Sequence, residues 1–151
     1  MITQIFYSQK AHFRNELKNS SIKVRLQKLR SIKKWIKKNE SLIVNEIKKD
    51  FNKGQEEILL SEIKPVLDEI NHAIEHLDSW MSPTKVATPL TFIGSSSKVI
   101  YEPKGVSLII APWNYPFNLC VGPLVSAISA GCTAVIKPSE NTPFTSDLVK
   151  K

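Results

Sequence analysis

The sequence of 151 residues contains little cysteine and only five glycines, against nine prolines. Two cysteines, Cys120 and Cys132, are too few for the disulfide framework of a secreted domain, so we expect a reducing compartment and a cytoplasmic protein. No run of about 18 apolar residues occurs, and the N-terminus lacks the charged segment, apolar core and cleavage site of a signal peptide. These absences indicate a globular protein of one-domain size, with no membrane anchor in this segment.

The positive charge of the chain is concentrated near its N-terminus. The net charge is +7; residues 1–53 carry 14 Lys and Arg against 4 Asp and Glu, whereas the rest of the chain carries 7 against 10. No aromatic residues interleave these lysines in a way that would stack on bases. We therefore interpret them as solvated helix faces and not as a nucleic-acid interface, with binding to phosphate or an anionic membrane as the weaker alternative.

Three stretches in the first half repeat apolar residues at the spacing of an amphipathic helix. They cover residues 22–36, 43–51 and 59–81. Pro65 lies inside the third stretch, and because proline lacks a backbone N–H and crowds the preceding turn, we expect a kink or a helix start there. The helix should end at SPTKVATP, where two prolines and small residues disfavour its continuation.

The second half changes to extended segments that alternate with helices. Residues 106–112 and 132–138 predict strands buried on both faces, because they read VSLIIAP and CTAVIKP. Between them a helix should open at Pro116 and close at Gly131, and a last helix should follow Thr142 as its N-cap. This order predicts a parallel sheet with right-handed crossovers. Two such strands do not complete a sheet, so we expect further strands downstream.

His72 and His76 stand in the sequence HAIEH, which matches the HxxEH pattern of one class of zinc peptidases. Two histidines one turn apart can share a helix face and bind a metal ion, with the glutamate as a base. Such a site needs a further ligand downstream, and a five-residue pattern often arises by chance. We therefore assign no metal site and keep zinc binding as a remote alternative to a solvent-facing histidine pair.

Cys120 and Cys132 are also candidates for a catalytic nucleophile. Cys120 falls inside a predicted helix and Cys132 begins a predicted strand, where cysteine usually packs as a small apolar residue. No histidine stands near either of them in the sequence to activate the thiol. Neither cysteine is assigned a catalytic role.

Polar side chains follow both predicted strands, at the edge where a parallel sheet binds ligands. The strands lead into APWNYP and KPSENTP, so Asn114, Lys137 and Glu140 should line the same rim. An amide held between prolines is a fixed neutral donor suited to a developing oxyanion, and a lysine with a glutamate can bind a ribose. A rigid structural turn is the alternative. Neither GxGxxG nor a P-loop occurs, so a nucleotide would not be bound through those fingerprints.

The chain resembles the N-terminal part of an aldehyde dehydrogenase, on the segments PKGVSLIIAPWNYPFNL, PLVSAISAG and AVIKPSENTP. Within that superfamily it is most similar to the class 3 branch, which has a short N-terminus. The resemblance covers essentially all 151 residues, and the pair PWNYP and KPSE is its most specific part.

The resemblance implies roles for residues at the rim. Asn114 would supply its side-chain amide to the oxyanion hole of the thiohemiacetal formed from the aldehyde. Lys137 and Glu140 would contact the adenosine ribose of NAD or NADP. Ile110 and Trp113 would line the cofactor cleft.

The resemblance also implies an architecture and a partner. The fold would be α/β, with N-terminal helices in residues 1–82, an extended oligomerisation hairpin in 83–104, and the incomplete first βαβα part of a Rossmann-like NAD(P)-binding sheet in 105–151. Tyr115 would lie towards the substrate tunnel. The whole enzyme would be a homo-oligomer, such as a dimer, that acts on an aldehyde substrate.

Two departures from the family pattern occur in this chain. Cys132 stands where the family commonly has asparagine, which we expect to alter packing and turn geometry and not chemistry. The family's nucleophilic cysteine and general-base glutamate lie downstream of this segment, and Cys120 and Cys132 do not match the nucleophile. We therefore expect aldehyde oxidation to a carboxylic acid in the whole enzyme and no activity from these residues alone. The alternative is a non-catalytic product of a truncated gene that binds nucleotide or partner subunits.

Overall fold

The computed structural model describes residues 2–150 and is mixed α/β. The α-helices are α1 (Ile2–His12), α2 (Ile22–Lys38), α3 (Glu40–Asp50), α4 (Gln55–Ile58), α5 (Lys64–Met81), α6 (Asn118–Ser129) and α7 (Pro143–Lys150). Shorter helical turns are π-helical at Phe13–Leu17 and Leu59–Ile63 and 3-10 at Leu90–Phe92. The strands are β1 (Thr84–Val86), β2 (Ser97–Val99), β3 (Val106–Ile110) and β4 (Thr133–Lys137). The helices therefore come first, and the parallel strands follow, as the sequence predicted.

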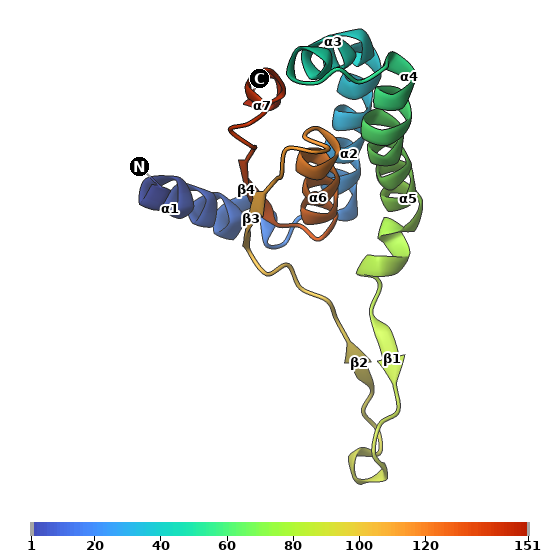
Figure 1. Ribbon diagram of the computed structural model, residues 1–151. Helices are drawn as coiled ribbons and strands as arrows, with labels where there is room; N and C mark the ends of the chain where they lie inside the picture. Colours follow the sequence, from blue (N-terminus) through green and yellow to red (C-terminus); the bar gives the residue numbers. More distant parts are fainter. Residues whose placement is uncertain (1, 151) are drawn as a thin grey trace.

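The β3–α6–β4 unit lies at the centre of the helices (Figure 1). Strands β3 and β4 pair in parallel, and α6 is the crossover between them. Helix α6 packs against α2 and α5 on one side of the strands, and α1 contacts the strands from the other side. Helix α3 packs against α7. No helix among residues 2–150 is long and apolar enough to cross a membrane.

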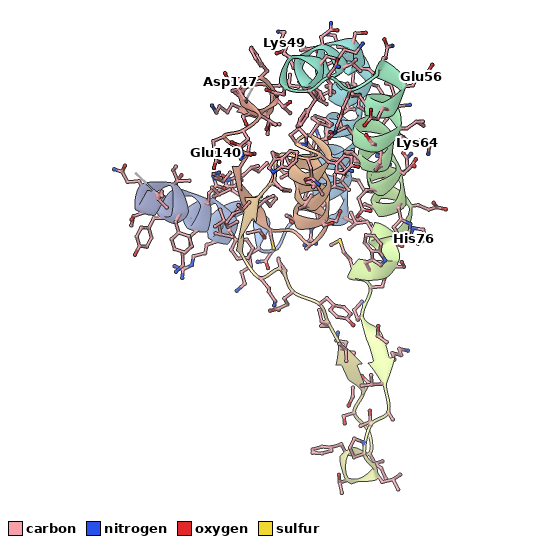
Figure 2. All side chains as sticks on the ribbon, in the orientation of Figure 1. Lys49, Glu56, Lys64, His76, Glu140 and Asp147 are labelled. Atoms are coloured by element: carbon pink, nitrogen blue, oxygen red, sulfur yellow. The ribbon has the colours of Figure 1, made fainter. Side chains whose placement is uncertain are left out.

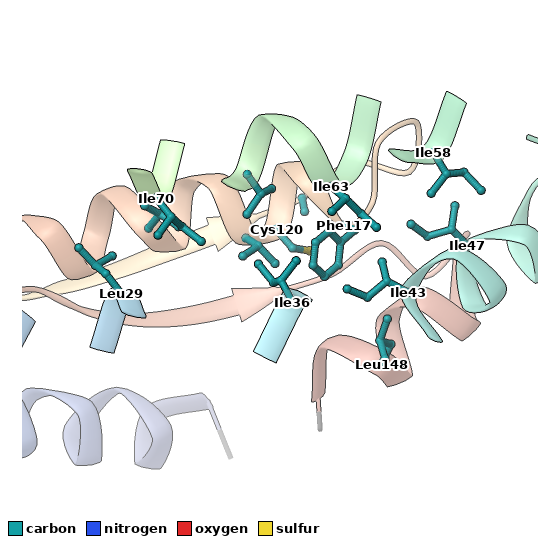
Figure 3. Packing of buried hydrophobic residues seen from close by; sticks show 14 of the residues in the cluster. Leu29, Ile36, Ile43, Ile47, Ile58, Ile63, Ile70, Phe117, Cys120 and Leu148 are labelled. Carbon is teal, nitrogen blue, oxygen red and sulfur yellow. The ribbon is translucent and has the colours of Figure 1, made fainter. Parts of the chain in front are cut away.

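The core is formed by the apolar faces of α2, α3, α5 and α6 (Figure 3). Leu29 and Ile36 of α2 are almost completely buried, as the helical stripe over residues 22–36 predicts. Phe117, just before α6, is 2% exposed and lies beside Ile63 and Cys120 in this cluster. Burying a side chain of this size stabilises the fold by about 1.5–3 kcal/mol. The apolar stripes, and not the lysine-rich faces, thus hold the helices together.

The prediction that both parallel strands are buried on both faces is wrong. Leu108 and Ile110 of β3 are 65% and 68% exposed, although Ile109 between them is buried. Successive side chains of a strand point to opposite faces, and Ile136, the register partner of Ile109, packs on the core. Helix α1 covers the other face only loosely: it contacts both strands, but none of its residues is buried. Within residues 2–150, β3 pairs only with β4.

The segment between α5 and β3 forms an extended arm (Figure 1). Strands β1 and β2 pair antiparallel, and the Thr88 side-chain oxygen accepts a hydrogen bond from Ser97 N over 3.0 Å. The tip is apolar and exposed, with Leu90 at 86% and Ile93 at 87%. Residues 83–104 are thus extended as expected, whereas the division of the chain into three parts stays a prediction.

Pro65 lies where the helix changes from π to α, and not at a break in the helix: the chain stays helical from Gln55 to Met81. Helix α5 begins at Lys64, and the π-helical turn Leu59–Ile63 precedes it. Proline cannot donate to the carbonyl four residues earlier, which is that of Ser61. That oxygen instead accepts a hydrogen bond of 3.0 Å from Asn118 Nδ2 of α6. The proline therefore frees an acceptor that ties α6 to the preceding helix.

The ends of α6 and α7 confirm some of the predicted signals and correct others. Helix α6 opens at Asn118, two residues after Pro116, which lies in the preceding turn. Gly131 closes it with φ of 79°, a left-handed conformation that glycine adopts readily. Helix α7 follows Thr142, but the Thr142 hydroxyl donates to the Ser139 carbonyl. The capping carboxylate comes from the chain-distant Asp50.

Candidate functional site

The carboxyl ends of β3 and β4 bring two predicted site residues side by side. Ile110 and Lys137 are register partners in the parallel pair, and Ala111 N donates to Lys137 O over 3.0 Å. Register partners point to the same face of a sheet, and both side chains are exposed. The two loops that follow therefore leave the sheet at one edge, as expected for a ligand-binding rim.

The turn after β3 presents Trp113, Asn114 and Tyr115, all of them exposed. Trp113 stacks on Phe51, which follows α3, with ring centroids 6.4 Å apart and an interplanar angle of 25°. Lys53 Nζ donates to the main-chain oxygen of Asn114 over 2.7 Å and lies 4.4 Å from the centroid of the Tyr115 ring. The turn is thus held by the segment that follows α3, a contact that the sequence did not predict.

Glu62, like Lys53, contacts this turn and was not predicted from the sequence. Its side chain is completely buried, and its Oε1 accepts a 3.0 Å hydrogen bond from Lys53 Nζ. Its Oε2 accepts from the backbone N–H groups of Phe117 and Asn118, over 3.2 and 3.1 Å. A carboxylate at the N-terminus of a helix is favoured by the helix dipole and by these unpaired donors. Removing one partner of such a buried pair costs about 3–5 kcal/mol.

A signal for Glu62 was present in the sequence. Ile58 and Val66 stand four residues before and after it, and both are fully buried. A charged residue at this position in an apolar stripe has to be paired inside the protein. The apolar stripe alone does not identify the partners of Glu62, because they come from other segments.

Lys137 and Glu140 contact each other through Nζ and Oε2. Both side chains are exposed, at 53% and 75%, at the carboxyl end of β4 (Figure 2). The hydrogen bond from Lys137 lowers the pKa of the Glu140 carboxyl, with smaller contributions from a backbone hydrogen bond and the lysine charge. Glu140 is therefore a carboxylate at neutral pH, and the pair offers a donor and an acceptor to solvent.

The helix N-termini at this edge are already occupied by the protein's own carboxylates. Glu62 caps α6, and Asp50 accepts from Phe144 N and Thr145 N at the start of α7, over 3.2 and 2.7 Å. Free N–H groups at a helix N-terminus commonly bind phosphate. Here those groups are satisfied, so a dinucleotide at this rim would use side chains and not these two helix ends.

On α5, His72 is exposed and His76 is half-buried, and His76 lies near the start of the arm (Figure 2). Their rings are 4.2 Å apart, and Trp80 packs beside both. His76 Nδ1 lies 2.9 Å from the main-chain oxygen of His72. Among the residues described, no group of three or more His, Cys, Asp or Glu side chains is placed to hold a metal ion. The contacts of this pair are those of a surface aromatic cluster.

Cys120 and Cys132 are both buried and free of disulfide bonds. Burial raises the pKa of the Cys120 thiol to about 11, and the nearby Glu62 charge adds to this. A thiol is nucleophilic only as the thiolate. Cys120 is therefore a packing residue in α6, which agrees with its interpretation from the sequence.

The fold and the rim define a class of protein: an α/β protein built on a parallel βαβ unit, with its candidate site at the carboxyl edge of the strands. The chain belongs to the aldehyde dehydrogenase family, whose sequence profile matches residues 2–151.

Curated relatives support this assignment. The chain is 40% identical over 151 residues to 4,4'-diaponeurosporen-aldehyde dehydrogenase of Staphylococcus aureus, a match that covers 100% of this chain and 33% of that protein. It is 38% identical over 141 residues to aldehyde dehydrogenase family 3 comG of Dictyostelium discoideum, covering 93% of this chain and 28% of that protein. The chain thus spans about a third of the length of the relatives it matches.

Solved structures agree on the fold. The substrate-bound state of Staphylococcus aureus AldH superposes with a TM-score of 0.94 at 40% identity, over 99% of this chain and 32% of that one. Betaine aldehyde dehydrogenase from Staphylococcus aureus in complex with NAD+ gives a TM-score of 0.87 at 26% identity, over 98% of this chain and 29% of that one.

Proposed function

We propose that these residues serve an NAD- or NADP-dependent aldehyde dehydrogenase, which oxidises an aldehyde to a carboxylic acid through a cysteine thiohemiacetal. The observation that carries the proposal is the rim at the carboxyl ends of β3 and β4, where the Asn114 turn and the Lys137–Glu140 pair leave the sheet at one edge. Family membership and the NAD+ complex of a structural neighbour support it.

Asn114 is proposed as an oxyanion donor. The turn that carries it is exposed, so its amide is accessible to a ligand, and its backbone is fixed by Lys53. A neutral donor that is already in place stabilises charge that develops in the transition state without reorganisation. Tyr115, next in the chain, is proposed to lie towards the substrate.

The residues present fit a dinucleotide cofactor. Ile110 and Trp113 are 68% and 54% exposed although both are apolar, as expected of side chains that a flat apolar ligand would cover. Lys137 and Glu140 offer an ammonium and a carboxylate to a ribose on the same face as Ile110. When bound, NAD or NADP supplies the oxidising capacity that the reaction needs.

The exposed apolar arm is proposed as an oligomerisation element of a homo-oligomer. Its tip exposes three apolar side chains within four residues, Leu90, Phe92 and Ile93, at 63% or more. Single chains rarely leave such a patch uncovered.

The low cysteine content supports a cytoplasmic location for the protein.

The test is aldehyde-dependent NAD(P)H formation by the complete product of the coding sequence that contains these residues. Asn114→Ala should lower kcat by about 10²–10³-fold, the usual cost of removing one oxyanion donor. An unchanged kcat in that variant would remove the role proposed for Asn114.

A polypeptide of residues 1–151 alone should show no aldehyde oxidation, because neither Cys120 nor Cys132 matches the family's nucleophile. Saturable activity from that polypeptide would contradict this.

A further inference from the structure

We propose that Lys53 and Glu62 are positioning residues for Asn114, an inference that rests on the oxyanion role proposed above. Neither is expected to touch substrate or cofactor. They hold the backbone of the turn in the one place from which the Asn114 amide reaches the developing oxyanion.

The Lys53 ammonium links the Glu62 carboxylate to the main-chain carbonyl of Asn114. Its Nζ donates to Glu62 Oε1 over 3.0 Å and to the main-chain oxygen of Asn114 over 2.7 Å. It also lies 4.8 Å from the centroid of the Phe51 ring and 4.4 Å from that of Tyr115. Two acceptors and two aromatic rings thus surround one side chain that is only 13% exposed. A lysine held in this way has little freedom to move. The Asn114 carbonyl that it binds is therefore restrained as well.

Glu62 fixes the far end of the same turn. While its Oε1 pairs with Lys53, its Oε2 accepts from Phe117 N and Asn118 N at the start of α6. One buried carboxylate therefore holds the chain directly at residues 117–118 and, through Lys53, at Asn114. Asn118 Nδ2 adds a third tie, to the carbonyl of Ser61 beside Glu62.

The contact with Asn114 leaves its side chain available. Lys53 binds the main-chain oxygen, so this contact fixes the backbone without using the amide. The ends of the turn are held by backbone hydrogen bonds, from Ala111 N to Lys137 O over 3.0 Å and from Leu119 N to Tyr115 O over 2.9 Å. Among the described residues, none of these turn bonds involves the backbone of Asn114 itself. Without Lys53 the carbonyl of Asn114 would be free to rotate, and the amide would move with it. Misplacement of a catalytic group by about 1 Å can cost on the order of 10²-fold in rate.

The same chain offers a matched control. Lys64 and Asp68 of α5 form an ion pair of 2.6 Å whose side chains are 60% and 59% exposed. Lys64→Met removes the same charge from a solvent-facing side chain whose ion pair lies within α5. It should leave kcat and KM within about twofold of the wild type, since exposed pairs contribute little.

The experiment measures kcat and KM of the complete gene product for Lys53→Met, alone and combined with Asn114→Ala. Lys53→Met should lower kcat by about 10- to 100-fold with little change in the KM for the cofactor. In the Asn114→Ala background it should lower kcat by less than about twofold, because the group that it positions is already gone. A purely structural role would lower kcat by the same factor in both backgrounds.

A second variant guards against misfolding. Lys53→Met leaves a buried carboxylate without its ion-pair partner, so Lys53→Met/Glu62→Gln removes both charges while an amide oxygen can still accept from residues 117–118. Its kcat should stay as low as that of Lys53→Met, because Asn114 O still lacks its donor. Recovery to the wild-type kcat, or multiplicative losses with Asn114→Ala, would overturn the inference. If Asn114→Ala itself leaves kcat unchanged, the proposed function of Asn114 fails first.

Discussion

The Arg25 guanidinium fills the space that a β carbon on Gly131 would need. Such a carbon would lie 2.5 Å from Cζ and from one terminal nitrogen of Arg25. The guanidinium is held there by hydrogen bonds from Nε to Ser20 Oγ, 3.1 Å, and from Nη1 to the Ser129 carbonyl, 3.0 Å. A buried arginine of α2 thus ties the end of α6 to Ser20, which precedes α2.

Gly131→Ala should therefore destabilise the protein. The substitution combines a left-handed backbone, with φ of 79°, and a steric overlap with a group that is itself hydrogen-bonded. We expect a loss of at least about 2 kcal/mol, seen as a fall of about 5 °C in melting temperature. Gly54→Ala is the control, because a β carbon at Gly54 would meet no atom within 4 Å and its φ is −64°. Equal melting temperatures for the two variants would contradict this account.

Asp50→Ala should loosen α7. The Asp50 carboxylate accepts from Phe144 N, Thr145 N and the Thr145 hydroxyl. Losing such a cap costs about 1 kcal/mol, and hydrogen exchange should become faster at those two amides. Asp68→Ala removes an exposed carboxylate of α5 and should leave these exchange rates unchanged. Unaltered exchange in Asp50→Ala would show that α7 does not depend on this cap.

Cys120 should resist alkylation. With its pKa raised to about 11 from 9.0, its thiolate fraction at pH 8 is about 100-fold lower than that of an ordinary cysteine. A raised pKa means that the thiolate forms only at higher pH, so the labelling rate should keep rising about tenfold per pH unit from about pH 8 to 10. Iodoacetamide labelling followed by peptide mass spectrometry measures this. Labelling in urea, where burial is lost, is the control; fast labelling of the folded protein would be inconsistent with a buried thiol.

The Lys137–Glu140 pair should set the acid limit of cofactor binding, that is, the pH below which the affinity for the cofactor falls. Because Lys137 lowers the pKa of Glu140, the carboxylate stays ionised, and its share of the affinity is lost only as pH falls through that lowered value. Lys137→Met should weaken NAD or NADP binding and move the acid limit upward, toward the ordinary pKa of 4.5. The dissociation constant, followed by tryptophan fluorescence, measures both effects.

The control for that experiment is Lys150→Met. Lys150 forms an exposed i,i+3 pair with Asp147 at the same spacing as Lys137 and Glu140, but on α7. Its removal should leave both the dissociation constant and the acid limit unchanged. An acid limit that does not move in Lys137→Met would refute the coupling between lysine and carboxylate.

Local signals in the sequence were sufficient for several elements. The apolar spacing over residues 22–36 matches α2, Pro65 coincides with the change from π to α helix at the start of α5, and Gly131 ends α6. These features depend on periodicity, a missing N–H and a left-handed φ, all of which act within a few residues. They are readable because no distant partner is needed to produce them.

Other features were missed because their partners are distant in the chain. The lysines and arginines of α2 were expected on a solvated face, but Arg25 is buried against the end of α6. Thr142 was expected to cap α7, whereas Asp50, much earlier in the chain, supplies the carboxylate. Both strands were expected to be covered on both faces, yet Leu108 is 65% exposed.

The sequence by itself determined the order of helices and strands, the family, and which residues follow the parallel strands. Only the tertiary structure decided which groups hold those residues in place. Lys53 and Glu62 meet at the Asn114 turn because the segment after α3, the π-helical turn before α5, and the start of α6 pack together there. A buried charge must find its partner wherever the packed chain brings one, and sequence spacing does not report that distance.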